Sequence, residues 1–314
     1  MIKYLSRRIV TLFLTLFLVS ILTFTAFNLI PGDPVILILG TETTPQRADM
    51  LRSQLGLDRP MPVRYVEWLM GLVQGNFGNS IKYSLPVKSL IEGRLPTTIS
   101  LALLAIFLIV IIAIPVGIYC ARKRNMAIDK VLNSVSMLNL AVPNFFLGVL
   151  FIWVFGLQLK FFTPGNYVDY NENFVGFIGY LLFPALVIAL PNIAILVKFL
   201  RTAVINQLTA DYVRTAYSKG VSDNKVISHH VLKNALPPVI TLLGMIIAEI
   251  FSGSIIIEQV FSLPGIGRLL ISSISFRDFP LIQTLVVYIA FIVVFVNFLV
   301  DVLLQAIDPR IRVR

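Results

Sequence analysis

Long apolar stretches are the feature that most constrains how this chain can fold. A helix that crosses the hydrocarbon core of a bilayer needs about 20 consecutive, mostly apolar residues, and the sequence contains six stretches of that kind. They are Ile9 to Ile30, Thr97 to Tyr119, Val131 to Leu159, Phe174 to Val197, Val239 to Ile257 and Leu281 to Leu304. Only 13% of the residues are charged, against roughly 25% in an average soluble domain. The sequence therefore predicts an all-α integral membrane protein with six transmembrane helices.

Two of these stretches have features of their own. The first follows Lys3, Arg7 and Arg8, as a signal peptide would, but it is too long for one and no small-residue cleavage site follows. We therefore expect a retained helix. The third stretch contains Pro143, which predicts a kink or a tilt, with freed backbone groups covered by neighbouring helices.

Basic residues gather in alternate segments between the apolar stretches. The net charge is +3 before the first stretch, +3 over 121–131, +4 over 198–238 and +2 after Leu304, whereas the other loops lie between −1 and +1. By the positive-inside rule, both termini face the cytoplasm. The basic excess orients the helices and contacts anionic lipid. A nucleic-acid partner is not expected, because the sequence offers no soluble basic face.

We expect three parts along the chain. Residues 1–30 form the N-terminal tail and first transmembrane helix, residues 31–95 form an external subdomain, and residues 96–314 form a five-helix core that includes a cytoplasmic loop over 199–238. In the subdomain, Thr43 or Thr44 is expected to cap one helix, and a second helix is expected to begin at Pro62. Its apolar face could lie on the membrane surface, on neighbouring spans or on an external binding protein. That face comprises Tyr65, Trp68, Leu69 and Leu72.

The sequence offers no constellation typical of an enzyme. It contains no nucleophile paired with a base and no Gly-x-x-x-x-Gly-Lys-Ser/Thr phosphate loop. His229 and His230 are adjacent, so on a helix they point about 100° apart, which is unsuitable for chelation. We therefore expect no catalytic residue, no metal site and no cofactor in this chain.

Polar residues in the fifth stretch and in the loop after it are candidates for a transport pathway or gate. Glu249 lies well inside a predicted span, where carboxylates are costly and face a cavity or a partner. The segment from Phe261 to Gly267 breaks the helix and predicts a re-entrant loop. The alternative interpretation is that these residues serve helix packing through small side chains, and it stays open. The candidates are Glu249, Ser252, Ser254, Glu258, Pro264 and Gly265.

A polar segment from Asp211 to Pro238 separates the fourth and fifth stretches. Its spacing predicts a short amphipathic helix that ends at a left-handed Gly220. A second helix is expected from Ser222, its cap, to about Leu236, where Pro237-Pro238 would close it. The apolar face of the first helix would comprise Val213, Ala216, Tyr217 and Gly220, and the wetter face Asp211, Arg214 and Ser218. Such a segment could dock a soluble partner or lie on lipid.

These residues resemble a known family, the permease subunits of ABC importers of the peptide and nickel class. The cytoplasmic signature of that family reads Glu-Ala-Ala, three residues, Gly, nine residues and Ile-x-Leu-Pro, and Arg214-Thr-Ala216 precedes Gly220 at the same spacing. Arg214 and Thr215 stand where Glu and Ala would, and His230 stands where Ile would. The form Asp-Tyr-Val-Arg-Thr-Ala with His-Val-Leu-Lys-Asn-Ala is close to the variant of the peptide branch.

Six further segments, in order, are similar to the first of the two permeases in such importers. They are Pro31-Gly-Asp-Pro34, Leu55-Gly-Leu-Asp58, Tyr65-Val-Glu-Trp-Leu69, Gly75-Asn-Phe-Gly-Asn-Ser80, Leu95-Pro-Thr-Thr98 and Glu258-Gln-Val-Phe-Ser-Leu-Pro-Gly-Ile-Gly267. The resemblance implies an importer for oligopeptides or dipeptides in the cytoplasmic (inner) membrane of a prokaryote. It also implies a sister permease, two P-loop ATPase subunits that bind ATP and Mg, and an external substrate-binding protein. Nickel complexes or another small solute stay open as cargo, and a secondary transporter is the more distant alternative.

On this resemblance, the ATPase subunits would dock on the segment from Asp211 to Lys225. Arg214 and Lys219 would make polar contacts, and Ala216 and Gly220 would permit close approach. The predicted docking residues are Asp211, Arg214, Thr215, Ala216, Lys219, Gly220, Ser222, Asp223 and Lys225.

Overall fold

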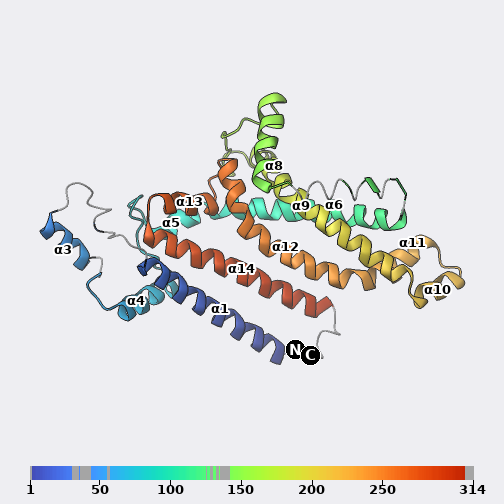
Figure 1. The fold of residues 1–314 in the computed structure, drawn as a ribbon, viewed down its shortest axis with the longest axis horizontal. Helices are drawn as coiled ribbons and strands as arrows, with labels where there is room; N and C mark the ends of the chain where they lie inside the picture. Colours follow the sequence, from blue (N-terminus) through green and yellow to red (C-terminus); the bar gives the residue numbers. More distant parts are fainter. Residues whose placement is uncertain are drawn as a thin grey trace.

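The structure is a computed structural model, and it describes residues 2–29, 35, 44–54, 57–124, 126–127, 130–131, 134 and 142–307. The named elements in these ranges are all helices, drawn in Figure 1. They are α1 (Ile2–Leu29), α3 (Pro45–Gln54), α4 (Met61–Val73), α5 (Val87–Glu92), α6 (Leu95–Arg122), α8 (Asn144–Phe151), η2 (Ile152–Gln158), α9 (Phe174–Leu208), α10 (Asp211–Ser218), α11 (Asp223–Lys225), η3 (Val226–Val231), α12 (Leu232–Val260), α13 (Ile266–Ser275) and α14 (Phe279–Ile307). The elements η2 and η3 are π-helical turns.

Five helices in the described part of the chain are long and apolar enough to cross a membrane. They are Leu5–Leu29, Val87–Arg122, Phe174–Leu208, Asp223–Val260 and Phe279–Leu303. Five of the six predicted spans are thereby confirmed in length and composition. The third predicted span falls partly on residues outside the described ranges. Its described part is the shorter apolar helix Asn144–Gln158, which begins directly after Pro143 and stands out from the bundle in Figure 1.

Helix α9 lies at the centre of the bundle, between α6 and α12, and α14 packs on α12. Two glycines allow the helices to approach closely. A Cβ at Gly117 on α6 would lie 2.9 Å from the Leu200 side chain, and a Cβ at Gly244 on α12 would lie 2.1 Å from Val300 on α14. Small residues at such crossings are typical of helix packing in membranes, where van der Waals contact drives association.

Helix α1 is attached to the outside of this core, against α14 and α4. At one end, Arg8 forms an ion pair with Asp301 at 2.7 Å. At the other end, Phe24 packs against Tyr65 and Trp68 of α4, and the Ser20 and Tyr65 hydroxyls share a hydrogen bond of 2.8 Å. The apolar face of α4 was expected on the membrane surface, on neighbouring spans or on an external binding protein. The structure shows that it contacts a neighbouring span, α1.

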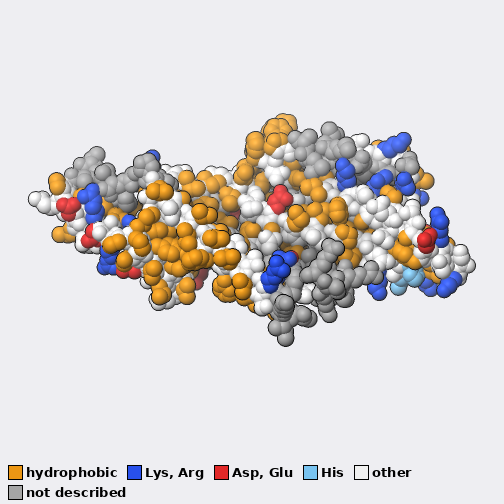
Figure 2. Space-filling view, turned by 60° about the horizontal axis from the view of Figure 1, so that its bottom comes forward, with side chains coloured by type: hydrophobic (Ala, Val, Ile, Leu, Met, Phe, Trp, Pro, Cys, Tyr) orange, Lys and Arg blue, Asp and Glu red, His pale blue; other side chains and the backbone are white. Residues whose placement is uncertain are grey.

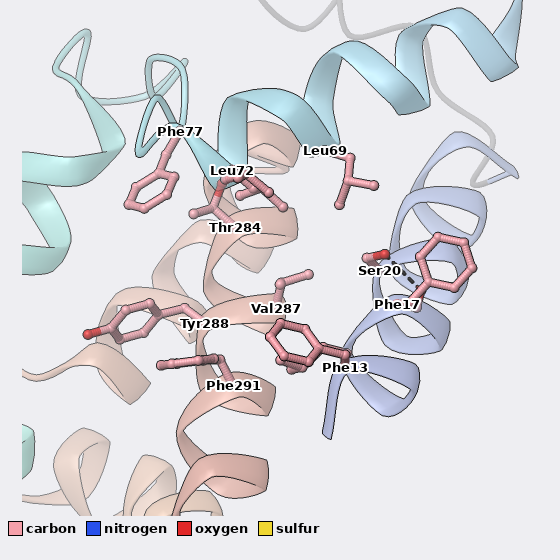
Figure 3. Close-up of a pocket in the computed structure, with 12 residues that line it drawn as sticks. Phe13, Phe17, Ser20, Leu69, Leu72, Phe77, Thr284, Val287, Tyr288 and Phe291 are labelled. Atoms are coloured by element: carbon pink, nitrogen blue, oxygen red, sulfur yellow. Dashed lines mark hydrogen bonds between the residues drawn. The ribbon is translucent and has the colours of Figure 1, made fainter. Parts of the chain in front are cut away.

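An apolar cavity of about 510 Å³ lies between these two attachments. Figure 3 shows it bordered by α1, α4 and α14, with Phe13 facing Val287 and Phe291. Leu69 and Leu72 of α4 close one end. Its mostly apolar lining is compatible with hydrocarbon.

The two ends of the bundle differ in composition. In Figure 1, the first residues of α1 and the last residues of α14 point toward the end that carries α10 and α11, whereas α3, α4, α5 and α13 lie toward the other end. Figure 2 shows Lys and Arg side chains gathered over the α10–α11 end and broad hydrophobic surface between the ends. The end with α3 and α4 carries both signs of charge.

Candidate functional site

Gly220 lies after α10 and ends it in the left-handed conformation, with φ of +74°. The Gly220 N–H donates to the Tyr217 carbonyl at 2.9 Å, and the Val221 N–H donates to the Ala216 carbonyl at 3.2 Å. This pair is the Schellman pattern, which satisfies the last carbonyls of a helix. A Cβ at Gly220 would meet no atom within 4 Å, so backbone conformation, and not crowding within the chain, requires the glycine. The predicted bend is confirmed.

Buried valines hold this bend on the core. Val213 of α10 and Val226 and Val231 of η3 are at most 1% exposed, and they share a cluster with Val204 of α9. Fully burying one valine contributes about 1.5 to 3 kcal/mol relative to leaving it exposed. We call the segment from Asp211 to Val231 the coupling hairpin. The buried side of the coupling hairpin fixes it to α9 and α12.

Eight of the nine predicted docking residues are exposed on the coupling hairpin. Asp211 and Arg214 are only 4.0 Å apart, but both side chains are largely in solvent, so this pair contributes little to stability and leaves both charges accessible. The ninth residue, Ala216, is 7% exposed and faces the chain's own core. The small side chain of Ala216 therefore packs within the hairpin, and its predicted role in the approach of a partner stays a prediction. The exposed residues are Asp211, Arg214, Thr215, Lys219, Gly220, Ser222, Asp223 and Lys225.

Tyr217 was expected on the apolar face, but its side chain is 43% exposed. Its hydroxyl donates to Asp223 Oδ1 at 2.7 Å, which connects α10 to α11 across the Gly220 bend. Because this hydrogen bond favours the neutral phenol, it raises the pKa of Tyr217 above its ordinary value, with a smaller contribution from burial. Ser222 occupies the N-cap position of α11, as predicted, but its side chain makes no capping hydrogen bond.

The expected stop at Pro237-Pro238 is wrong. Helical backbone continues through both prolines to Val260. A proline inside a helix lacks the N–H that would bond the carbonyl four residues earlier. Here those carbonyls belong to Lys233 and Asn234, which are exposed, so water can satisfy them. The hairpin is therefore joined to the membrane-spanning part of α12 by continuous helix.

The carboxylate of Glu258 fixes the start of α13 at the opposite end of the bundle. Glu258 is fully buried, and it accepts hydrogen bonds from the Thr98 hydroxyl (2.7 Å), the Gly267 N–H (2.7 Å) and the Arg268 N–H (3.2 Å). The Thr98 hydroxyl in turn accepts the Ile266 N–H at 2.9 Å. The first N–H groups of a helix need partners and favour negative charge. Glu258 and Thr98 together cap α13.

The glycines around this cap are required by close contact. A Cβ at Gly265 would lie 2.2 Å from Glu258 Oε2, and a Cβ at Gly267 would lie 2.5 Å from the Ile255 backbone. Contacts under 3.0 Å do not occur at real Cβ atoms. The two glycines in the turn between α12 and α13 thus allow α13 to pack directly on α12.

Asp278 is a second buried carboxylate, which the sequence reasoning missed. It caps α14 through the Leu281 N–H at 3.4 Å and also accepts from the Ser80 hydroxyl and the Ile81 and Lys82 N–H groups. Asp278 thereby pins the loop before α5 to the start of α14. The only local signal was an Asp three residues before the predicted span that begins at Leu281, close to the position of an N-cap. Its partners at 80–82 could not be found from local spacing.

The predicted pathway or gate residues fall into two groups. Ser254, Glu258 and Gly265 are buried and Pro264 is half-buried, whereas Glu249 and Ser252 are exposed. The buried group belongs to the packing of α12 and α13. The exposed group lies on a stripe that continues along α12 at helical spacing. The stripe consists of Thr241, Met245, Glu249, Ser252 and Ile256.

This stripe, the α12 stripe, differs from the outer faces of other spans. The exposed positions in the middle of α6 are apolar, as are most of those on α1, and both faces suit contact with lipid. The α12 stripe carries two hydroxyls and a carboxylate. A carboxylate facing hydrocarbon near the centre of a span costs about 2.5 to 3.5 kcal/mol or more. The apolar positions compared are Ile99, Leu103, Phe107 and Ile111 on α6, and Phe13, Leu14, Phe17, Leu18 and Leu22 on α1.

Known proteins are similar to this chain over its full length. It is 39% identical over 306 residues, 98% of each chain, to a Brucella abortus protein with the provisional name peptide transport system permease protein. It is 37% identical over 315 residues, 99% of this chain and 100% of the relative, to the oligopeptide transport system permease protein AppB of Bacillus subtilis. A probable peptide ABC transporter permease protein of Sinorhizobium fredii is 36% identical over 309 residues, covering 98% and 99%.

Two family models also match. Residues 1–102 match the N-terminal model for membrane components of binding-protein-dependent transport systems. Residues 113–313, which include the coupling hairpin, the α12 stripe and the Glu258 cap, match the inner membrane component of binding-protein-dependent transport systems. The chain is therefore a multi-pass membrane protein that belongs to the family of inner membrane components of binding-protein-dependent transport systems.

Proposed function

We propose that this chain is a permease subunit of an ATP-driven importer of oligopeptides or dipeptides. The observation that carries the proposal is the coupling hairpin: an exposed polar surface of eight predicted docking residues, held on the core by fully buried valines. The names of three relatives at 36–39% identity, all of them peptide or oligopeptide permeases, support the cargo.

The proposed assembly contains a sister permease, two ATPase subunits that bind ATP and Mg, and an external substrate-binding protein. The ATPase subunits dock on the coupling hairpin through Arg214, Lys219 and the residues around Gly220. The open space beside Gly220 leaves room for a partner to approach the bend closely. The hairpin and both ends of the chain face the cytoplasm, in agreement with the Lys and Arg side chains gathered at that end.

Coupling then follows from the continuity of the hairpin with the spans. ATP binding closes the ATPase pair and displaces the hairpin, which moves as a unit with α9 and α12 because its valines are buried between them. Such a bundle has two conformations, and the binding of ATP and of cargo each shifts the equilibrium between them. The α12 stripe, with Glu249 and Ser252, lines the pathway between the two permeases.

Reconstituted vesicles that contain the whole complex test this proposal. We expect ATP-dependent uptake of a labelled peptide in the presence of the binding protein. Reversing charge at Arg214 and Lys219 to Glu should abolish cargo-stimulated ATP hydrolysis, while the matched reversal of Lys88, which is exposed on α5 at the opposite end, should leave it intact. Unchanged stimulation in the Arg214 and Lys219 variant would refute docking on this surface.

A further inference from the structure

Glu249 is a carboxylate with no cation to balance it within the described part of the chain. None of the ion pairs among the described residues includes Glu249. Glu249 is exposed and stands ten residues after Val239 and eight before Ile257. At about 1.5 Å per residue, it lies roughly 15 Å and 12 Å from the two ends of the predicted span, near the middle of the membrane.

The surroundings of Glu249 on α12 are open within this chain. Its neighbour Ser252 is exposed, and its hydroxyl donates to the Glu249 carbonyl at 3.0 Å, so the hydroxyl does not use the carboxylate. Gly253 is also exposed, and a Cβ there would meet no atom within 4 Å. Small residues beside an acidic group leave room for a ligand to reach it.

We propose that the Glu249 carboxylate receives the positively charged amino terminus of a peptide as it passes along the α12 stripe. This inference rests on the proposed function. An exposed intramembrane carboxylate needs a cation or water, and a free peptide brings a cation, because its α-amino group is mostly protonated at neutral pH. A charge-assisted hydrogen bond between the two is stronger than a neutral one, and it selects peptides with a free amino end.

The test compares two peptides of identical sequence, one with a free amino terminus and one acetylated there, in vesicles that contain the assembled transporter. For Glu249→Gln, uptake of the free peptide at low concentration should fall about ten-fold, the loss expected for one hydrogen bond to a charged group. Uptake of the acetylated peptide should change little. Glu249→Asp should restore part of the preference for the peptide with a free amino terminus. Ser252→Ala, on the same stripe, should change the uptake of both peptides by the same factor.

The ratio of the two uptake rates is the deciding quantity. The same binding protein serves the native chain and the variants, so its own preference cancels when these ratios are compared. An equal loss for both peptides, or loss of assembly, would mean that Glu249 pairs with a cation of a neighbouring subunit and would overturn the proposal, as would an unchanged ratio. If the native complex takes up neither peptide, the proposed function itself fails, and that result is distinguishable from the others.

Discussion

Replacing Glu258 by alanine should detach α13 from the bundle. The change removes the acceptor of three donors: the Thr98 hydroxyl and the Gly267 and Arg268 N–H groups. A buried donor left without a partner costs about 1 to 3 kcal/mol. Arg268 is exposed, so water can reach its N–H, and two uncompensated donors remain. We therefore expect a loss of roughly 2 to 6 kcal/mol.

The chain carries its own reporter for this loss. Cys120, the only cysteine in the sequence, is 1% exposed, so a thiol-reactive dye labels it when the core opens. In a complex whose other subunits lack cysteine, Glu258→Ala should be labelled at lower temperature than the native chain, and trypsin should cut sooner after Arg268. Gly265→Ala should give the same result, because its Cβ would occupy the position of the carboxylate.

Gly179→Ala is the matched control for Gly265→Ala. It also adds a methyl group to a glycine of a membrane helix, but that methyl would meet nothing within 4 Å. We expect no loss of stability there, because alanine is the better helix former. If Glu258→Ala and Gly265→Ala behave like Gly179→Ala, the capping role of Glu258 is wrong.

Four further predictions concern the coupling hairpin and the loop before α5. Gly220→Asn should retain more coupling between cargo and ATP hydrolysis than Gly220→Val, because asparagine tolerates positive φ; equal losses would point to contact with the partner and not to backbone strain. Val213→Ala should weaken the hairpin by about 2 kcal/mol, from lost burial and a small cavity, and hydrogen exchange in α10 should rise while exchange in α9 stays the same. Asp278→Ala should expose Lys82 to trypsin, because the loop loses its acceptor; unchanged cleavage would show that other contacts hold the loop. The hydrogen bond of Tyr217 to Asp223 stabilises the folded hairpin below the ordinary tyrosine pKa, and this contribution should disappear as the pH rises through the raised pKa; a hairpin whose stability is equally pH-dependent in Tyr217→Phe would contradict it.

Local rules predicted the parts of this molecule that local chemistry decides. The apolar stretches predicted five helices of membrane-spanning length, and Gly220 predicted the left-handed bend, since only backbone conformation requires a glycine there. The spacing of Val213 and Ala216 predicted the buried side of α10. Each of these features depends on residues close together in sequence.

The features that were missed or wrong depend on distant partners or on solvent. Glu258 and Asp278 obtain their roles from Thr98 and Ser80, which are 160 and 198 residues away. Pro237-Pro238 did not end the helix, because water and neighbouring helices can compensate for the lost hydrogen bonds. The separation of exposed Glu249 from buried Glu258 likewise follows from how α12 packs and not from its own sequence.

The most direct test of the central claim is site-specific photo-cross-linking in the assembled complex. A photoreactive residue at Lys219, exposed on the coupling hairpin, should form an adduct with an ATPase subunit. The same residue at Lys88, exposed at the opposite end of the bundle, should form none. An ATPase adduct at Lys88, or its absence at Lys219, would contradict the proposed docking surface and the proposed orientation of the chain in the membrane.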